Sequence, residues 1–141
     1  MPINKNVVYP AQFNSIFIRE HPRFEDDLRK LVERSGVKDK FWGQYRERLK
    51  FLNEYSELCS KKTVWFENLR YTGEDLYAMK FKDQKNIRII FAFIEYMQKQ
   101  YAVLLYPFQE KEKTKKRDSY AAAMPGALKR LSEIREGLDN V

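Results

Sequence analysis

The sequence is poor in cysteine, histidine and glycine, and it has no long apolar segment. Its single cysteine, Cys59, excludes a disulfide within the chain and is typical of a reducing cytoplasm, where we expect the protein. His21 is the only histidine, so a zinc site built on several histidines and cysteines is excluded. No apolar run approaches the roughly 20 residues that span a membrane, and the first residues lack the apolar region of a signal peptide. There is also no glycine-rich phosphate-binding loop.

Apolar residues, by contrast, are abundant. Hydrophobic residues make up 43% of the 141 positions and aromatic residues 15%, enough for the core of one domain over residues 1–141. The predicted elements describe an α+β domain, in which a small antiparallel sheet carries helices on one face. Residues 1–22 have the least clear pattern. Within them Val7–Ile18 contains Pro10, which favours an edge strand or an extended arm.

The clearest pattern consists of three runs rich in β-branched and aromatic residues. The runs are Leu76–Phe81, Ile87–Tyr96 and Tyr101–Phe108. The polar gaps between them are short enough for hairpin turns. We therefore predict a three-stranded antiparallel meander, to which Val7–Ile18 can add a further strand. Apolar residues of segment 60–73 are expected to cover its edge.

Side chains alternate between the two faces of a strand, which predicts what each face of the meander carries. The residues expected to face the helices are Tyr77, Met79, Phe81, Ile89, Phe91, Val103 and Leu105. Lys80, Arg88 and Tyr106 then share the opposite face on adjacent strands, about 4.8 Å apart, where they can contact one phosphodiester. The alternative is that Lys80 and Arg88 are solvated charges on an exposed face.

Three segments have the apolar spacing of amphipathic helices. Phe24–Arg34 begins with three acidic residues, which favour a helix N-terminus. Phe41–Cys59 carries a longer apolar stripe, which indicates a core helix. The last helix is predicted within Ser119–Gly137, and Pro125 favours a start after the preceding residue, Met124.

The positive charge is concentrated in one part of the chain. The net charge is +7, and residues 80–130 hold 12 Lys and Arg against 5 Asp and Glu. Residues 1–79 are nearly balanced, with 14 against 12. A basic surface on one module is typical of proteins that bind nucleic acid. The alternative is that the charge serves solubility alone.

The order of the elements and four short motifs resemble the RelE/HigB superfamily of toxins from type II toxin–antitoxin systems, in its phage-derived HigB-like branch. The motifs are LYAMKF (76–81), NIRIIFAF (86–93), LLYPFQEK (104–111) and ALKRLSEI (127–134). The family pattern reads L-[YW]-E-L-R, then Y-R-I-x-Y, then L-L-H-x-F-x-K-K, then a final A-x-x-R helix. The resemblance covers about residues 41–136. Two departures affect the chemistry, because Ala78 replaces the usual glutamate and Tyr106 the frequent histidine.

The resemblance implies an mRNA interferase, an endoribonuclease that cuts mRNA on the ribosome through attack of the RNA 2′-OH on its own phosphate, with no metal or other cofactor. Arg88 matches the arginine of the second motif and would stabilise the pentavalent phosphorane. Tyr106 would transfer a proton or stack on a base, and Lys80 would act at the phosphate. The lysines expected to bind RNA are Lys111, Lys113, Lys115 and Lys116.

The resemblance also implies partners. These are mRNA, the ribosome and a cognate antitoxin, expected to be a small helix-turn-helix protein with an acidic segment that covers the basic excess in a heteromeric complex. No membrane partner is expected. Two other functions stay open at this point. One is a ParE-like gyrase inhibitor, which has the same fold and cleaves nothing. The other is a non-catalytic basic module that binds RNA or a protein partner, its activity lost through the changes at Ala78 and Tyr106.

Overall fold

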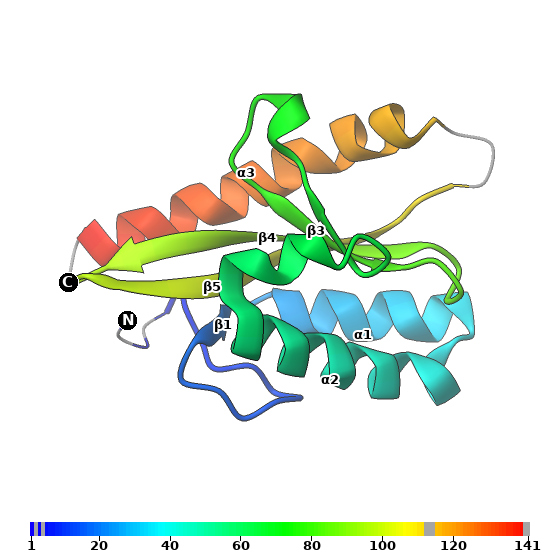
Figure 1. Ribbon diagram of the computed structural model, residues 1–141, viewed down its shortest axis with the longest axis horizontal. Coiled ribbons are helices and arrows are strands. Elements are labelled where there is room, and N and C mark those ends of the chain that lie inside the picture. Colours follow the sequence, from blue (N-terminus) through cyan, green and yellow to red (C-terminus); the bar gives the residue numbers. More distant parts are fainter. Residues whose placement is uncertain (2, 4, 112–114, 140–141) are drawn as a thin grey trace.

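The computed structural model describes residues 1, 3, 5–111 and 115–139, with the backbone alone for Lys116 and Arg117. Over these residues the fold is α+β, with a mixed sheet between helices (Figure 1). The strands are β1 (Ile18–Glu20), β2 (Phe66–Asn68), β3 (Tyr77–Phe81), β4 (Ile87–Tyr96) and β5 (Lys99–Gln109). The helices are α1 (Phe24–Ser35), α2 (Lys38–Tyr55) and α3 (Lys116–Asp139), with short 3-10 helices η1 (Ser56–Lys61) and η2 (Arg70–Thr72) on either side of β2.

The predicted meander is confirmed, but the sheet is larger than predicted. Strands β3, β4 and β5 are consecutive and antiparallel, and the full order is β1-β5-β4-β3-β2. Strand β2 extends the sheet beside β3, where the sequence predicts only a cover for the edge. At the other edge β1 runs parallel to β5, with Ile18 opposite Ala102. The N-terminal strand shares only Ile18 with the predicted segment Val7–Ile18 and continues beyond it to Glu20. Within the predicted segment, Val8 forms a single bridge to Glu20.

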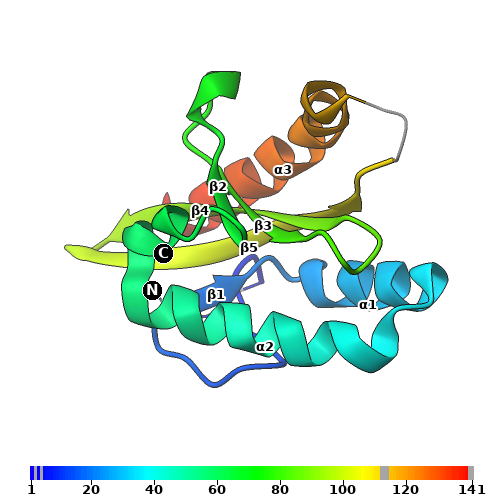
Figure 2. The ribbon, with the colours of Figure 1, turned by 45° about the vertical axis from the view of Figure 1, so that its right-hand side comes forward.

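Helices cover both faces of the sheet, so the prediction of helices on one face is wrong. Helices α1 and α2 lie against one face and α3 crosses the other (Figures 1 and 2). The residues of β4 explain this arrangement. Ile89 and Phe91 are buried with α1 and α2, whereas Ile90 and Ala92 are buried with α3. A strand that is apolar on both faces has to be covered on both.

A β-bulge in β5 changes the alternation of its side chains. Ile90 lies opposite Tyr106, but the next residue, Phe91, lies opposite Leu104, so Leu105 is an extra residue in β5. A bulge of this kind turns two successive side chains toward the same face. Leu105 and Tyr106 accordingly both contact the α3 layer.

Because of the bulge, part of the prediction for which side chains of β5 face α1 and α2 is wrong. Val103 and Leu105 are buried beneath α3 and not against α1 and α2, because one extra residue reverses the alternation. Ala102 and Leu104 take their place in the α1–α2 layer. The other residues predicted for that layer are confirmed there: Tyr77, Met79, Phe81, Ile89 and Phe91.

The helices follow the predicted segments with differences in α2 and α3, whereas α1 matches its prediction to within one residue. Helix α2 begins at Lys38, three residues before the predicted Phe41, and ends at Tyr55, where the chain continues as η1. Helix α3 begins at Lys116, so the predicted start after Met124 is wrong, and Pro125 lies inside the helix. Tyr120 and Ala127, on either side of this proline, are fully buried. Packing on the sheet thus outweighs the missing backbone hydrogen bond.

Candidate nucleic-acid interface

Lys80 and Arg88 lie together as predicted, but they lie inside the molecule. They are directly opposite each other on β3 and β4, on the α3 side of the sheet. Their exposed fractions are only 8% and 6%, so the interpretation as solvated surface charges is wrong. The Lys80 ammonium donates to the Thr63 carbonyl. Arg88 Nη2 lies 3.0 Å from Glu110 Oε2 in a buried ion pair. Neither cation faces solvent in this arrangement.

Arg88 belongs to a polar cluster beneath the first turns of α3, which we call the Arg88 cluster: Glu67, Arg88, Glu110, Ser119 and Tyr120. Burial raises the pKa of the Tyr120 phenol, and the charge of Glu67 raises it further. Arg88 Nε and the hydroxyls of Ser119 and Tyr120 are buried without a hydrogen-bond partner among the described residues. Glu110 stands where the family pattern has its first lysine, so a carboxylate neutralises Arg88 here.

A groove of about 950 Å³ lies between α1 and α3, over the end of β5. Its sides come from α1, the β3–β4 turn, β5 and α3. Its lining residues are Asp27, Lys30, Leu31, Arg34, Lys85, Asn86, Tyr106, Pro107, Phe108, Gln109, Glu110, Lys111 and Arg130. Segments far apart in the sequence thus contribute to one concave surface.

Cations outnumber carboxylates in this groove. Its two carboxylates, Asp27 and Glu110, are in ion pairs with Arg130 and Arg88. The exposed cations of the groove are Lys30, Arg34, Lys85 and Lys111. Lys30 also pairs with a neighbouring carboxylate of α1. The other three exposed cations form no ion pair with a described residue, which leaves their charge available to a bound anion.

Tyr106 lines the groove and is held there by α3. The guanidinium carbon of Arg130 lies 5.1 Å from the centre of the Tyr106 ring. The same guanidinium donates to the Leu105 carbonyl at 2.9 Å and to the Asp27 carboxylate. Gly126 allows α3 to approach the Tyr106 ring this closely, because a Cβ atom at residue 126 would lie 2.6 Å from Tyr106 Cε1. Arg130 therefore fixes both the bulge and the aromatic ring beside it.

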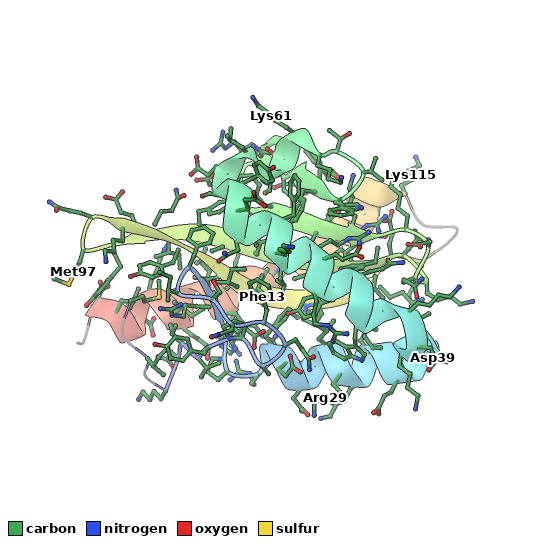
Figure 3. All side chains as sticks on the ribbon, turned by 60° about the horizontal axis from the view of Figure 1, so that its bottom comes forward. Phe13, Arg29, Asp39, Lys61, Met97 and Lys115 are labelled. Carbon is green, nitrogen blue, oxygen red and sulfur yellow. The ribbon has the colours of Figure 1, made fainter. Side chains whose placement is uncertain are left out.

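The structure separates the residues predicted for the site into two groups. Tyr106 and Lys111 line the groove, whereas Lys80 and Arg88 are buried beside it. Lys115 is exposed immediately before α3 (Figure 3). The side chain of Lys116 and the whole of Lys113 lie outside the described residues.

Four cations of the groove were not predicted as site residues from the sequence: Lys30, Arg34, Lys85 and Arg130. For three of them the sequence contains a pattern that could have indicated the site. Lys30 and Arg34 are four residues apart, which places them on the same side of α1. Arg130 is the arginine of the A-x-x-R pattern in the final motif. Lys85 carries no signal, because its position depends on the β3–β4 turn.

Two further observations bear on the identity of the site. Among residues 1, 3, 5–111 and 115–139, no three His, Cys, Asp or Glu side chains gather as ligands for a metal ion, and no helix is long and apolar enough to cross a membrane. Comparison with known protein families, curated proteins and solved structures finds no match for the chain.

Proposed function

We propose that the protein binds RNA in the α1–α3 groove and cleaves it, as an mRNA interferase of the toxin–antitoxin type. The observation that carries the proposal is the convergence of Arg34, Lys85 and Lys111 beside the half-buried Tyr106 ring. Exposed cations along a groove suit the repeated charges of a phosphodiester backbone, and an aromatic ring suits an unpaired base. The resemblance to the RelE/HigB toxins supports mRNA on the ribosome as the substrate and an antitoxin as the partner.

The proposed reaction is an internal transesterification. The RNA 2′-oxygen forms a bond to the adjacent phosphorus, the bond from phosphorus to the 5′-oxygen breaks, and a 2′,3′-cyclic phosphate results. One group takes the 2′-OH proton and another protonates the leaving 5′-oxygen, and Tyr106 is our candidate for one of these transfers. Arg34 and Lys111 are candidates to stabilise the charge of the phosphorane. Arg88 is assigned no contact with RNA while Glu110 neutralises it.

The ion pair between Arg88 and Glu110 supports a second candidate function. With Arg88 paired to Glu110, the protein lacks the free arginine that the resemblance assigns to the phosphate. A non-catalytic module that binds RNA in the groove fits this arrangement. The two candidates share the groove and differ only in cleavage.

A charge-removal experiment tests the groove. The variant Arg34→Gln/Lys85→Gln/Lys111→Gln is compared with Lys38→Gln/Lys50→Gln/Lys61→Gln, which removes the same charge from exposed positions outside the groove. We expect the groove variant to lose at least about tenfold in affinity for single-stranded RNA and to reduce the slope of log K against log salt by about 2. Equal losses in both variants would show that the charge acts without a defined site.

Cleavage is tested separately on translating ribosomes. Tyr106→Phe should bind ribosomes normally and lose cleavage, because it keeps the ring and removes the ionisable proton. If the wild-type chain binds RNA in the groove but leaves mRNA intact on translating ribosomes, the non-catalytic module replaces the nuclease.

A further inference from the structure

The two parts of α3 are attached to the rest of the molecule differently. After residue 126, Arg130 pairs with Asp27, and Glu133 lies 2.8 Å from Arg23 Nη2 and 3.4 Å from His21 Nε2. These contacts join the second part of α3 to α1 and to the chain just before it. Residues 119–124, in contrast, contact the sheet mainly through apolar groups, those of Tyr120, Ala123 and Met124.

The two residues that favour a helix least lie between these parts. Pro125 has no N–H, so its helical hydrogen bond to the Ala121 carbonyl cannot form, and its ring crowds that turn. Gly126 follows directly and has the lowest helix propensity after proline. Sharp bends in helices occur at such positions, and hinges use a few residues that absorb the change in backbone angles.

The interior below residues 119–124 holds buried polar atoms that no described residue partners. These atoms are the Ser119 hydroxyl, the Tyr120 hydroxyl and Arg88 Nε, all buried without a hydrogen-bond partner among the described residues. The Tyr120 ring meets the Phe108 ring edge to face, with ring centres 5.3 Å apart. Phe108 lies opposite Arg88 in the sheet. Buried polar groups without partners favour any state in which they reach water.

We propose that residues 119–124 of α3 form a lid over Arg88 and Glu110 and that this lid opens about Pro125 and Gly126 while the second part of α3 stays clamped. Opening gives the Arg88 guanidinium access to solvent beside the groove, which its partner Glu110 already lines. The regulatory meaning of this motion rests on the proposed function. In the closed state the groove binds RNA, and in the open state an RNA phosphate competes with Glu110 for the Arg88 guanidinium.

Thiol labelling tests the lid without any RNA. Ser119→Cys places a thiol on the buried side of the lid, and Ala127→Cys places one in the clamped part. Cys59 is an internal reference for global unfolding, because it is fully buried and burial raises the pKa of its thiol to about 12. We expect the thiol at position 119 to react with a disulfide reagent at least about 100-fold faster than the thiols at positions 127 and 59.

The hinge is tested by adding Pro125→Ala to the same chains. Alanine restores the backbone hydrogen bond, so we expect labelling at position 119 to slow by at least about tenfold, with no change at position 127. Ser132→Ala, at an exposed position of the clamped part, is the control and should change neither rate. The lid is disproved if all three thiols react at one common rate, or if Pro125→Ala leaves the rate at position 119 unchanged.

Hydrogen exchange gives a second measurement on the chain without added cysteines. Amides of residues 120–124 should exchange faster than those of residues 128–134, and Pro125→Ala should remove most of this difference. Equal protection in both parts of the wild-type helix would also overturn the lid. These results are independent of the RNA-binding comparison for the groove, so the lid and the proposed function can fail separately.

Discussion

The position of the Tyr106 ring requires a glycine at residue 126, because the ring occupies the space that a larger side chain would fill. In Gly126→Ala the new Cβ atom would lie 2.6 Å from Tyr106 Cε1, so the ring or α3 has to move. We expect this variant to lose about 1–3 kcal/mol in the free energy of unfolding, measured by urea denaturation, although alanine favours a helix.

Gly43→Ala is the matched control, since a Cβ atom at this position in α2 would meet no atom within 4 Å apart from its chain neighbours and the backbone of its own helix. It should stabilise the protein by about 0.5–1 kcal/mol. If Gly126→Ala were equally stabilising, the close contact between α3 and Tyr106 would not exist in solution.

Glu20 makes stability depend on pH. Burial, and secondarily the charge of Glu25, raises its pKa to about 8 from an ordinary value of 4.5. The folded state therefore holds a proton here that the unfolded state has released, so its contribution is complete below pH 4.5 and is lost as pH rises through 8. Glu20→Gln keeps an acceptor for the Tyr45 hydroxyl and should not show this loss.

The measurement is the free energy of unfolding between pH 6.5 and 8.5. Burial lowers the pKa of His21 to about 4 from an ordinary value of 6.5, so its imidazole still titrates in the unfolded chain near pH 6.5. His21 is the same in wild type and in Glu20→Gln, so the difference between the two proteins removes its contribution. Wild type should lose stability relative to Glu20→Gln, by on the order of a few kcal/mol at most. Glu47→Gln, at an exposed position, is the control and should follow wild type. Parallel curves for wild type and Glu20→Gln would contradict the neutral, buried carboxyl.

Among the elements, the β4–β5 hairpin has an unusual turn. Met97 and Gln98 both have positive φ, 50° and 67°. This is the type I′ geometry, which asparagine and glycine adopt far more easily. Met97 is 79% exposed and projects from the tip of the hairpin (Figure 3), so its replacement removes little packing.

We expect Met97→Asn/Gln98→Gly to raise the free energy of unfolding by about 1 kcal/mol. The control Met97→Ala removes the side chain and keeps the strained backbone, so it should be nearly neutral. Chemical denaturation of both variants measures the difference. A destabilised double variant would mean that these side chains make contacts that matter more than backbone strain.

The elements also show why the sequence predicts some features and not others. The alternation of β3 and β4 is regular, and their register follows from it. The apolar character of Ile90 and Ala92 already indicates a second covered face. The bulge at Leu105 has no comparable local signal, because the residues around it are apolar on both faces. Helix α3 passes through Pro125 for tertiary reasons that a local pattern does not contain.

At the scale of the whole molecule, Arg130 joins three elements. It connects α3 to Asp27 of α1 and to the Leu105 carbonyl of β5. Arg130→Ala would leave a buried carbonyl without its donor and Asp27 without its partner. We expect a loss of about 2 kcal/mol or more in the free energy of unfolding, measured by urea denaturation.

Arg135→Ala provides the comparison, because Arg135 is exposed in the same helix. It should change stability by less than about 0.5 kcal/mol. Similar small effects for both variants would mean that α3 is held by its apolar contacts alone.

The groove illustrates what local patterns leave out of a candidate site. Lys111 and Tyr106 are found from the motifs of β5, because both lie within one short segment. Arg34 and Lys85 join them only through the packing of α1 and the β3–β4 turn. Arg88 is placed correctly on its strand, yet its burial depends on α3 and its neutralisation on Glu110.

The parallel pairing of β1 with β5 has a consequence for the order of events during synthesis. Ile18 is made early, but its partner Ala102 leaves the ribosome only after α1, α2 and three further strands have been synthesised. Closing so long a loop is slow, and the contacts it brings come late. The apolar sides of α1 and α2 therefore stay exposed to solvent until the central strands of the sheet have been synthesised. We expect the nascent chain to bind chaperones until β5 emerges, and to acquire its native fold in one late step.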